Sequence, residues 1–299
     1  MAIQLEIWAA DIAENLFPDN AFYAKAVIDD AYVVGKTVHV PNAGSPPGVT
    51  VNRSSLPATA AARTDTDLTY TIDELTTDPS KLGFTESAQI AYDKRISLLK
   101  DHIGALQDAT ALRFAYAWGA VTNIIRTTGT ARAAYKSGQT GDRKAITKAD
   151  ILNAQRILNG HNVPQSGRIM LIDSDLLVDL LSIDEFMSYD KLGYSNLTEG
   201  AIGRILGFDV MIRSWTVLYT NAATPVKVPV GTATAATHNV GTLFWHPGFV
   251  RRALGTVQLF EDLGNPLYYG DIFSALALTG GAIGRNDEKG VVTLVEAAA

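Results

Sequence analysis

The carboxylates of Asp173 and Asp175 form the arrangement in this sequence that comes nearest to a catalytic motif. They flank Ser174 directly after the predicted buried strand 168–172, a place where an α/β enzyme can hold metal-binding or acid–base carboxylates. At the start of a helix the same residues would instead cap the free N–H groups and interact favourably with the helix dipole. We prefer capping, with Ser174 as the cap of a short helix through Leu181. An α/β metal-dependent enzyme using Asp173 and Asp175 is an alternative.

Other sequence signatures of catalysis are missing. The chain has no Gly-x-x-x-x-Gly-Lys-Ser/Thr loop for nucleotide phosphates and no Gly-x-Ser-x-Gly nucleophile elbow. Its five histidines are scattered without the helical spacing of a zinc site, and it contains no cysteine for thiolate ligands or disulfides. The glycine-rich runs 200–203 and 280–284 are explained by turns. The sequence therefore predicts no catalytic residue, no cofactor and no metal.

Composition indicates a folded protein with no dedicated nucleic-acid surface. The 299 residues are 47% hydrophobic and 19% charged, and the formal net charge is −6. A dedicated nucleic-acid binder usually carries a basic excess, although passive contact with DNA is compatible with this balance. No run reaches the roughly 18 apolar residues of a membrane helix, and the first residues lack the pattern of a signal peptide. We expect no membrane partner and synthesis in a cytoplasm.

The first third of the chain predicts an unusual excursion. Apolar residues at Leu5, Trp8, Ile12 and Leu16 have the spacing of an amphipathic helix, which packs on its own subunit or docks on a neighbour. Strands are predicted at 37–40, closed by Pro41, and at 68–72. About two dozen residues rich in Pro, Gly, Ala, Ser and Thr lie between them, which is long for a loop in a compact domain. Because 49–52 alternates, we predict an extended two-stranded excursion; a disordered surface loop is the alternative.

The rest of the chain predicts a long helix followed by an α/β lobe. The long helix runs from about 86 to 118, with Thr85 as its N-cap and His102 in a packing or surface position. Its predicted buried stripe comprises Tyr92, Ile96, Leu99, Ile103, Leu106, Thr110, Phe114 and Ala117. A capping box of Thr147 and Asp150 begins another helix, with Ile151, Leu152, Ile157 and Leu158 on its buried face and Gly160 at its C-cap. Strands are predicted at 168–172, 208–213, 257–259, 272–278 and 291–295, with a turn at Gly280-Gly281.

Three segments, and above all the order of the elements, resemble a known family. The segments are Gly-Lys-Thr-Val-His-Val-Pro at 35–41, the stretch 162–172, and 197–210 with its Gly-x-Ile-Gly and Gly-Phe-x-Val pattern. They are similar to the major capsid proteins of tailed double-stranded DNA phages, which have the Hong Kong 97-like fold. The resemblance implies an α+β protein with an N-terminal arm (1–35), an extended β-hairpin called the E-loop (36–79), a peripheral domain (80–145 and 246–283) containing a spine helix at about 86–118, and an axial α/β domain (146–245 and 284–299).

The same resemblance implies a function in assembly. Such a subunit self-assembles into pentamers and hexamers of an icosahedral shell that encloses the genome, and it resides in the virion capsid after assembly in the host cytoplasm. Its implied partners are further copies of itself, a portal, and packaged DNA in non-specific contact. No long charged helical segment precedes the arm, so a separate scaffolding protein is expected. An encapsulin-like nanocompartment shell is the alternative within the same fold.

The resemblance also assigns intersubunit contacts. We expect Val49, Val51, Arg53, Leu56 and Arg63 of the E-loop to lie on a neighbouring subunit, and we expect Trp8 and Ile12 to anchor the arm. Some relatives join subunits by an isopeptide bond from an E-loop lysine. The stretch from Thr37 to Ser80 contains no lysine, with Lys36 and Lys81 only at its borders. We therefore predict no such cross-link.

Overall fold

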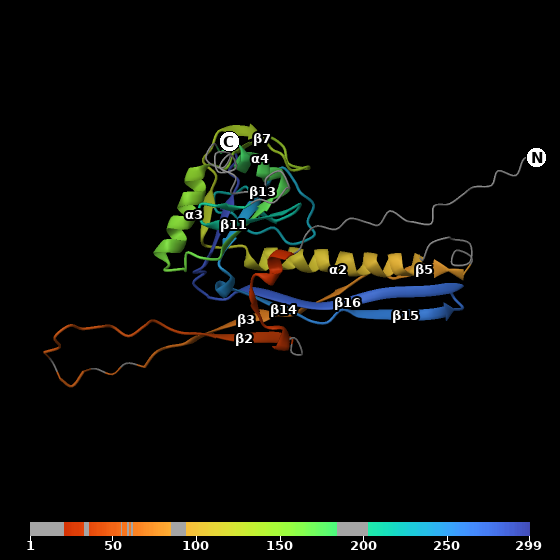
Figure 1. Ribbon diagram of the computed structural model, residues 1–299, viewed down its shortest axis with the longest axis horizontal. Helices are drawn as coiled ribbons and strands as arrows, with labels where there is room; N and C mark the ends of the chain where they lie inside the picture. Colours follow the sequence, from red (N-terminus) through yellow and green to blue (C-terminus); the bar gives the residue numbers. More distant parts are fainter. Residues whose placement is uncertain are drawn as a thin grey trace, which may run out of the picture.

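The computed structural model describes residues 21–32, 36–54, 56–58, 60, 62–84, 94–183 and 203–299. Two lobes and one projecting hairpin make up the described chain (Figure 1). A long helix lies along a six-stranded sheet in the first lobe, and a seven-stranded sheet with shorter helices forms the second lobe above the C-terminal end of that helix. None of the described helices combines the length and the apolar character that a membrane span requires.

The long helix α2 (Lys94–Trp118) packs along strand β16 (Gly270–Ile283). At 1.5 Å per residue its described part is about 37 Å long. Leu106, Thr110 and Phe114 of the predicted stripe are buried. Ile96, however, is 52% exposed, so the predicted stripe is wrong there. Thr85 and residues 86–93 lie outside the described residues.

Small side chains explain why the buried face of the first half of α2 differs from the predicted stripe. Ser97 and Gly104 are buried in place of the larger neighbours, which lets the helix approach the sheet closely. His102 is also buried, and its Nδ1 lies 2.8 Å from the Thr77 hydroxyl. His102 is thus a packing residue bound to the segment after β4.

The six-stranded sheet is built around β16, which has neighbours on both sides. Strands β14 (Val250–Leu254) and β15 (Gln258–Asn265) pair with one side of it, and β4 (Asp73–Thr76) and β5 (Ser80–Gly83) pair with the other. The short strand β1 (Val27–Ile28) adds in parallel to β14. Gly280 and Gly281 lie inside β16, opposite Ala253 and Arg252, so the predicted turn at this pair is wrong. A Cβ on Gly281 would lie 2.9 Å from Cδ1 of Phe114, and glycine is needed because α2 comes so close.

The hairpin consists of β2 (Thr37–Asn42) and β3 (Thr66–Thr71), which pair antiparallel. Pro41 does not close the first strand, as predicted, but lies within it opposite Asp67. The Ile72 N–H donates to the Lys36 carbonyl, so the hydrogen-bonded pairs fall at 36/72, 38/70 and 40/68. The pair of Pro41 and Asp67 is therefore a non-hydrogen-bonded one, where the ladder needs no N–H from proline.

The base of the hairpin is fixed to the first lobe. Val38, Val40 and Tyr70 are buried in one cluster with Ala253 of β14. The Tyr70 hydroxyl donates to Asp29 at 2.8 Å, and the same carboxylate accepts from Arg251 at 2.8 Å. Burial raises the pKa of Tyr70, and its bond to Asp29 adds to the rise. The hairpin thus leaves the body in a set direction.

The seven-stranded sheet contains strands from distant parts of the chain. Its order is β10 (Arg204–Ile205), β11 (Phe208–Arg213), β9 (Arg168–Asp173), β13 (His238–Trp245), β17 (Val291–Val295) and β6 (Ile124–Arg126), and β12 (Val217–Thr220) also pairs with β13. A separate two-stranded sheet joins β7 (Ala131–Ala133) and β8 (Asp142–Lys144). Because β6 pairs with β17, the chain enters this sheet soon after α2 ends.

Helix α3 (Lys148–Gly160) covers this sheet and begins as predicted. The Thr147 side chain accepts from the Asp150 N–H while the Asp150 carboxylate accepts from the Thr147 N–H, which confirms the capping box. Two predictions at this helix are wrong. Leu152 is exposed, whereas Ile151 and Leu158 are fully buried. Gly160 is the last helical residue, and the chain takes its left-handed turn at Asn162, with a φ of 57°.

An aromatic cluster joins the two lobes. Phe22, of the short helix η1 (Ala21–Ala24), lies 5.8 Å from the Trp118 ring and 6.4 Å from the Trp245 ring. Trp118 ends α2 and donates its indole N–H to the Arg251 carbonyl, and Trp245 ends β13 and donates to the Lys25 carbonyl. All three rings are fully buried. The lobes therefore share one core.

Candidate assembly surfaces

The carboxylates singled out in the sequence have a structural role. Asp173 is fully buried at the end of β9 and accepts from the Asp175 N–H at 3.0 Å, so Asp173, and not Ser174, caps the helical turn that leads into α4 (Leu177–Leu181). Lys136 Nζ lies 2.8 Å from Asp173 and 3.4 Å from Asp175. Burial raises the pKa of Asp173, and the bond from Lys136 opposes that rise. A carboxylate so enclosed has no access to a substrate, and the capping interpretation is confirmed.

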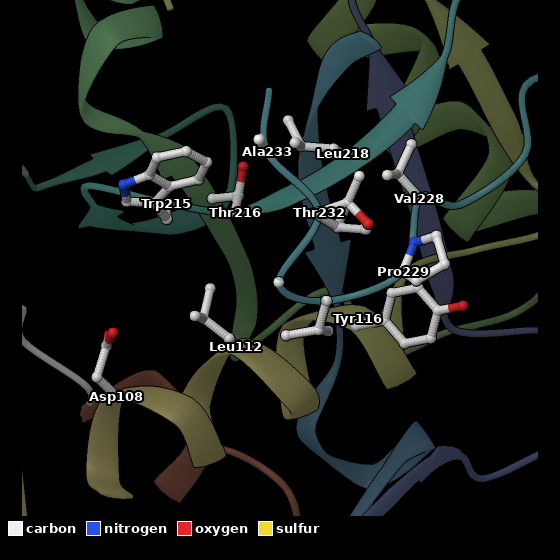
Figure 2. A pocket seen from close by; sticks show the side chains of 13 residues that line it. Asp108, Leu112, Tyr116, Trp215, Thr216, Leu218, Val228, Pro229, Thr232 and Ala233 are labelled. Atoms are coloured by element: carbon white, nitrogen blue, oxygen red, sulfur yellow. The ribbon is translucent and has the colours of Figure 1, made fainter. Parts of the chain in front are cut away.

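A mostly apolar groove lies between α2 and the second lobe (Figure 2). It has a volume of about 360 Å³, and its walls include Leu112 and Tyr116 of the helix and Trp215 and Pro229 of the lobe. Its one carboxylate, Asp108, is engaged by the buried guanidinium of Arg213. The described residues contain no group of three or more His, Asp or Glu able to hold a metal ion. The groove therefore offers mainly apolar side chains, and its carboxylate is already held in an ion pair.

The described residues between 43 and 65 project from the body as an extended loop, beyond the hairpin ladder (Figure 1). Pairing ends at Asn42 and Thr66, and no strand lies in the described part of 43–65. The predicted extended two-stranded excursion is therefore confirmed at β2 and β3, whereas the alternating residues 49–52 form no strand. Without a packed face a two-stranded ladder is only marginally stable in water, which explains why it stops.

The apolar side chains of this loop are in contact with almost nothing. Val49 is 93% exposed, and Val51 and Leu56 are each 81% exposed. Large side chains exposed to this degree occur singly on many surfaces, but three on one extended segment indicate a surface that another molecule covers. All five predicted loop residues lie on this segment, while Trp8 and Ile12 lie outside the described residues.

The two arginines of the loop have different hydrogen-bond partners. Arg63 pairs with Asp65 at 2.6 Å, and the Asp65 carboxylate also accepts from the Gly44 N–H at 2.8 Å. The hydrogen bond from Arg63 is the main reason that the pKa of Asp65 is lowered. Arg53 donates only to the Thr50 hydroxyl, at 3.2 Å, among the described residues. Arg53 is thus a cation without a carboxylate partner inside the described part of its own chain.

A second exposed surface, which was not predicted from the sequence, lies at the other end of the first lobe. Strand β15 is exposed along nearly its whole length, including Leu259, Phe260 and Leu263. Near its end, Leu267 and Tyr269 are also exposed. A signal was present: Gln-Leu-Phe-Glu-Asp-Leu at 258–263 lacks the alternation of a strand with one buried face. Apolar and acidic residues fall on both faces, which indicates a strand with neither face buried by its own subunit.

Comparisons with known proteins relate this architecture to virus shells. A family model described as phage capsid protein matches residues 80–294. The chain is similar to a solved structure from Mycobacterium phage Che8, at 17% identity and a TM-score of 0.68, covering 98% of this chain and 97% of that chain. It is also similar to the capsid structure of cyanophage P-SCSP1u, at 16% identity and a TM-score of 0.71, covering 99% and 93%.

A third solved structure, the capsid of a native GTA particle, is 12% identical with a TM-score of 0.66, covering 99% of this chain and 96% of that chain. No curated protein matches the sequence. At such low identities the likeness establishes the fold, and it does so over almost the whole length of the chain.

Proposed function

This chain belongs to the phage capsid protein family, and on that premise we propose that it is the major capsid protein of a tailed double-stranded DNA phage. Its α+β fold is the Hong Kong 97-like capsid fold, and it is a structural component of the virion and not an enzyme. In our proposal, copies close into pentamers and hexamers of an icosahedral shell around the genome.

The projecting loop is the observation that carries this proposal. A lone subunit gains nothing from holding Val49, Val51 and Leu56 in water, whereas covering each large apolar side chain is worth roughly 1.5–3 kcal/mol. A shell repeats the same contact many times by symmetry, so modest individual contacts suffice. Val49, Val51, Arg53, Leu56 and Arg63 are accordingly proposed as intersubunit residues, together with Trp8 and Ile12 of the arm.

The division into domains belongs to the same proposal. The arm covers 1–35 and the hairpin 36–79. The six-stranded sheet with α2 corresponds to the peripheral domain and the seven-stranded sheet to the axial domain. The pairing of β6 with β17 supports a boundary between the two domains at the end of α2, which lies earlier in the chain than residue 145. The start of β14 at Val250 supports a return of the chain to the peripheral domain near 246.

Further partners follow from the proposed role. A portal, a separate scaffolding protein and packaged DNA are the partners of a shell subunit of this kind, with assembly in the host cytoplasm. The formal net charge of −6 suits a wall that holds DNA loosely, because tight phosphate binding requires clustered cations.

Deleting residues 45–62 tests the proposal. Gly44 lies against Thr64, with a Cβ on Gly44 only 2.0 Å from the Thr64 carbonyl oxygen, so the shortened chain can close as a tight turn. We expect a soluble subunit with unchanged thermal unfolding that no longer forms closed shells in electron micrographs. The double variant Leu152→Ser and Val178→Ser, which changes exposed apolar residues of the other lobe, is the matched control and should assemble. Normal shells from the deletion variant would refute the proposal.

A further inference from the structure

The outer edge of β15 is a strand edge without a partner. Gln258–Asn265 pairs with β16 on one side, and no described residue pairs with its other side. In an antiparallel strand alternate residues direct their N–H and C=O groups to that open side. Proteins usually protect such an edge with lysine, proline or a covering segment, because it is a template for another strand. The strand from 258 to 265 contains neither lysine nor proline, and its pairing with β16 is regular from Gln258 to Asp262, before the register shifts.

The chemistry of β15 defines what would fit against it. Phe260 is 50% exposed, and Leu259 and Leu263 are exposed as well. Glu261 is paired with Arg95 of α2 at 2.7 Å. Asp262 accepts only from the Asn265 side-chain amide, at 2.6 Å, among the described residues, so its carboxylate lacks a cation there. The open edge therefore calls for an extended segment that carries apolar side chains and a positive charge.

A second copy of β15 does not satisfy these requirements. Antiparallel pairing of two copies centred on 258–265 would place Glu261 of each copy opposite Asp262 of the other, and the bulge between Asp262 and Asn265 interrupts that ladder. In any register, two copies bring four carboxylates onto one ladder and add no cation for Asp262. Like charges directly opposite one another destabilise a strand pair. The edge is therefore unsuited to pairing with itself.

The projecting loop has the complementary properties. Residues 43–63 contain two arginines and no acidic residue, and Arg63 is already paired with Asp65. In the sequence, Val49 and Val51 alternate with Thr50 and Asn52, as a strand with one apolar face would. Arg53 follows directly. In the unassembled subunit the backbone turns at Val51 and Asn52, with a φ of 47° at Asn52, so pairing as a strand requires this turn to straighten. The loop and β15 lie at opposite ends of the molecule, so they cannot meet within one subunit (Figure 1).

We propose that residues 49–53 of one subunit pair with the outer edge of β15 in an adjacent copy of this chain, with Arg53 beside Asp262. This inference rests on the proposed function and names the receiving surface for the loop. The main-chain groups of both segments are then satisfied together, Val49 and Val51 lie against the apolar residues of β15, and the two unpaired charges neutralise each other.

Disulfide trapping tests this contact because the natural chain has no cysteine. The variant Arg53→Cys with Asp262→Cys is assembled, oxidised and run on a denaturing gel without reductant. We expect a ladder of linked subunits that collapses to monomer on reduction. The control Arg53→Cys with Val178→Cys, whose second site is exposed on the other lobe, should remain monomeric. Assembled shells of the test variant that yield only monomer would overturn the inference.

A charge exchange provides an independent reading if the cysteine variant assembles poorly. Arg53→Glu should lower the yield of shells by about tenfold or more, and adding Asp262→Arg should restore it. An unchanged yield from Arg53→Glu, or no restoration by the second change, counts against the pairing. If the natural chain forms no shells even when it is co-expressed with a scaffolding protein, the proposed function fails. If the natural chain forms shells but the cysteine pair gives no cross-link and the charge variants do not change the yield, only the assignment of β15 as the receiving surface is wrong.

Discussion

At the residue scale, Glu288 fastens the end of α2 to the turn between β16 and β17. Its carboxylate accepts the N–H groups of Val121 and Thr122 at 2.9 and 2.8 Å, and the Thr122 hydroxyl at 2.6 Å. Glu288 has a φ of 51°, a left-handed conformation uncommon for a residue other than glycine. These bonds therefore hold both the turn and the segment that leads from one lobe to the other.

Glu288→Gln should lower the free energy of unfolding of the unassembled subunit by about 1–2 kcal/mol at pH 7. Burial raises the pKa of Glu288, but the hydrogen bonds from Thr122, Val121 and Asn123 outweigh it, and the folded pKa lies below the ordinary value of 4.5. The contribution is thus complete above pH 4.5 and is lost as the pH falls through the folded pKa. Urea unfolding of both proteins at pH 7 and at successively lower pH measures the difference.

Glu74→Gln is the matched control, because Glu74 is an exposed carboxylate on β4. Its stability should follow that of the natural chain at every pH. If Glu288→Gln and the natural chain differ by the same amount at pH 7 and in acid, the carboxylate is not the source of the stabilisation.

At the scale of elements, the contact between α2 and β16 depends on the absence of a side chain at Gly281. A Cβ there would lie 2.9 Å from Phe114 and 3.4 Å from the Ala117 Cβ. Phe114 belongs to the fully buried aromatic cluster, stacked 5.8 Å from Trp118, and has little room to shift.

Gly281→Ala should therefore destabilise the subunit by about 1–3 kcal/mol through overpacking. Thermal unfolding of the soluble subunit measures this change. Gly160→Ala serves as the control, because a Cβ at that last residue of α3 meets nothing within 4 Å. Equal stability of the Gly281 variant and the natural chain would mean that α2 and β16 separate without cost.

At the scale of the whole molecule, the two exposed surfaces lie at opposite ends. The projecting loop extends beyond β2 and β3, and β15 runs along the far end of the first lobe (Figure 1). Two different surfaces that meet head to tail generate rings when the rotation between copies closes. The shape of the subunit is therefore suited to the proposed pentamers and hexamers.

The absence of lysine from residues 37–80 predicts a shell whose subunits are held together by non-covalent contacts. An isopeptide bond from the hairpin would need a lysine amine, and residues 37–80 contain none. Mature particles boiled in denaturant should therefore give a single monomer band on a denaturing gel. Bands at multiples of the monomer that persist under reducing conditions would show that another lysine forms a cross-link.

The amino-acid sequence by itself determined the features that depend on neighbouring residues. Alternation predicted the strands around Val38 and Tyr70, and the helical period predicted the end of α2 at Trp118. The capping box at Thr147 and Asp150 was also predictable, because its two reciprocal hydrogen bonds join residues three positions apart. The long polar connection between two strands and the order of the elements were sufficient to identify the family.

Only the tertiary structure decided the features that depend on distant contacts. Ser97 and Gly104 of α2 are buried and Ile96 is exposed because β16 approaches the helix closely, and no local pattern contains that distance. Gly280 and Gly281 form part of a strand because they pair with Ala253 and Arg252, and Phe114 and the hairpin leave no room for a Cβ at either position. The open edge of β15 follows from which strands occupy the sides of β16, since strand partners from remote parts of the chain determine which backbone groups stay unpaired.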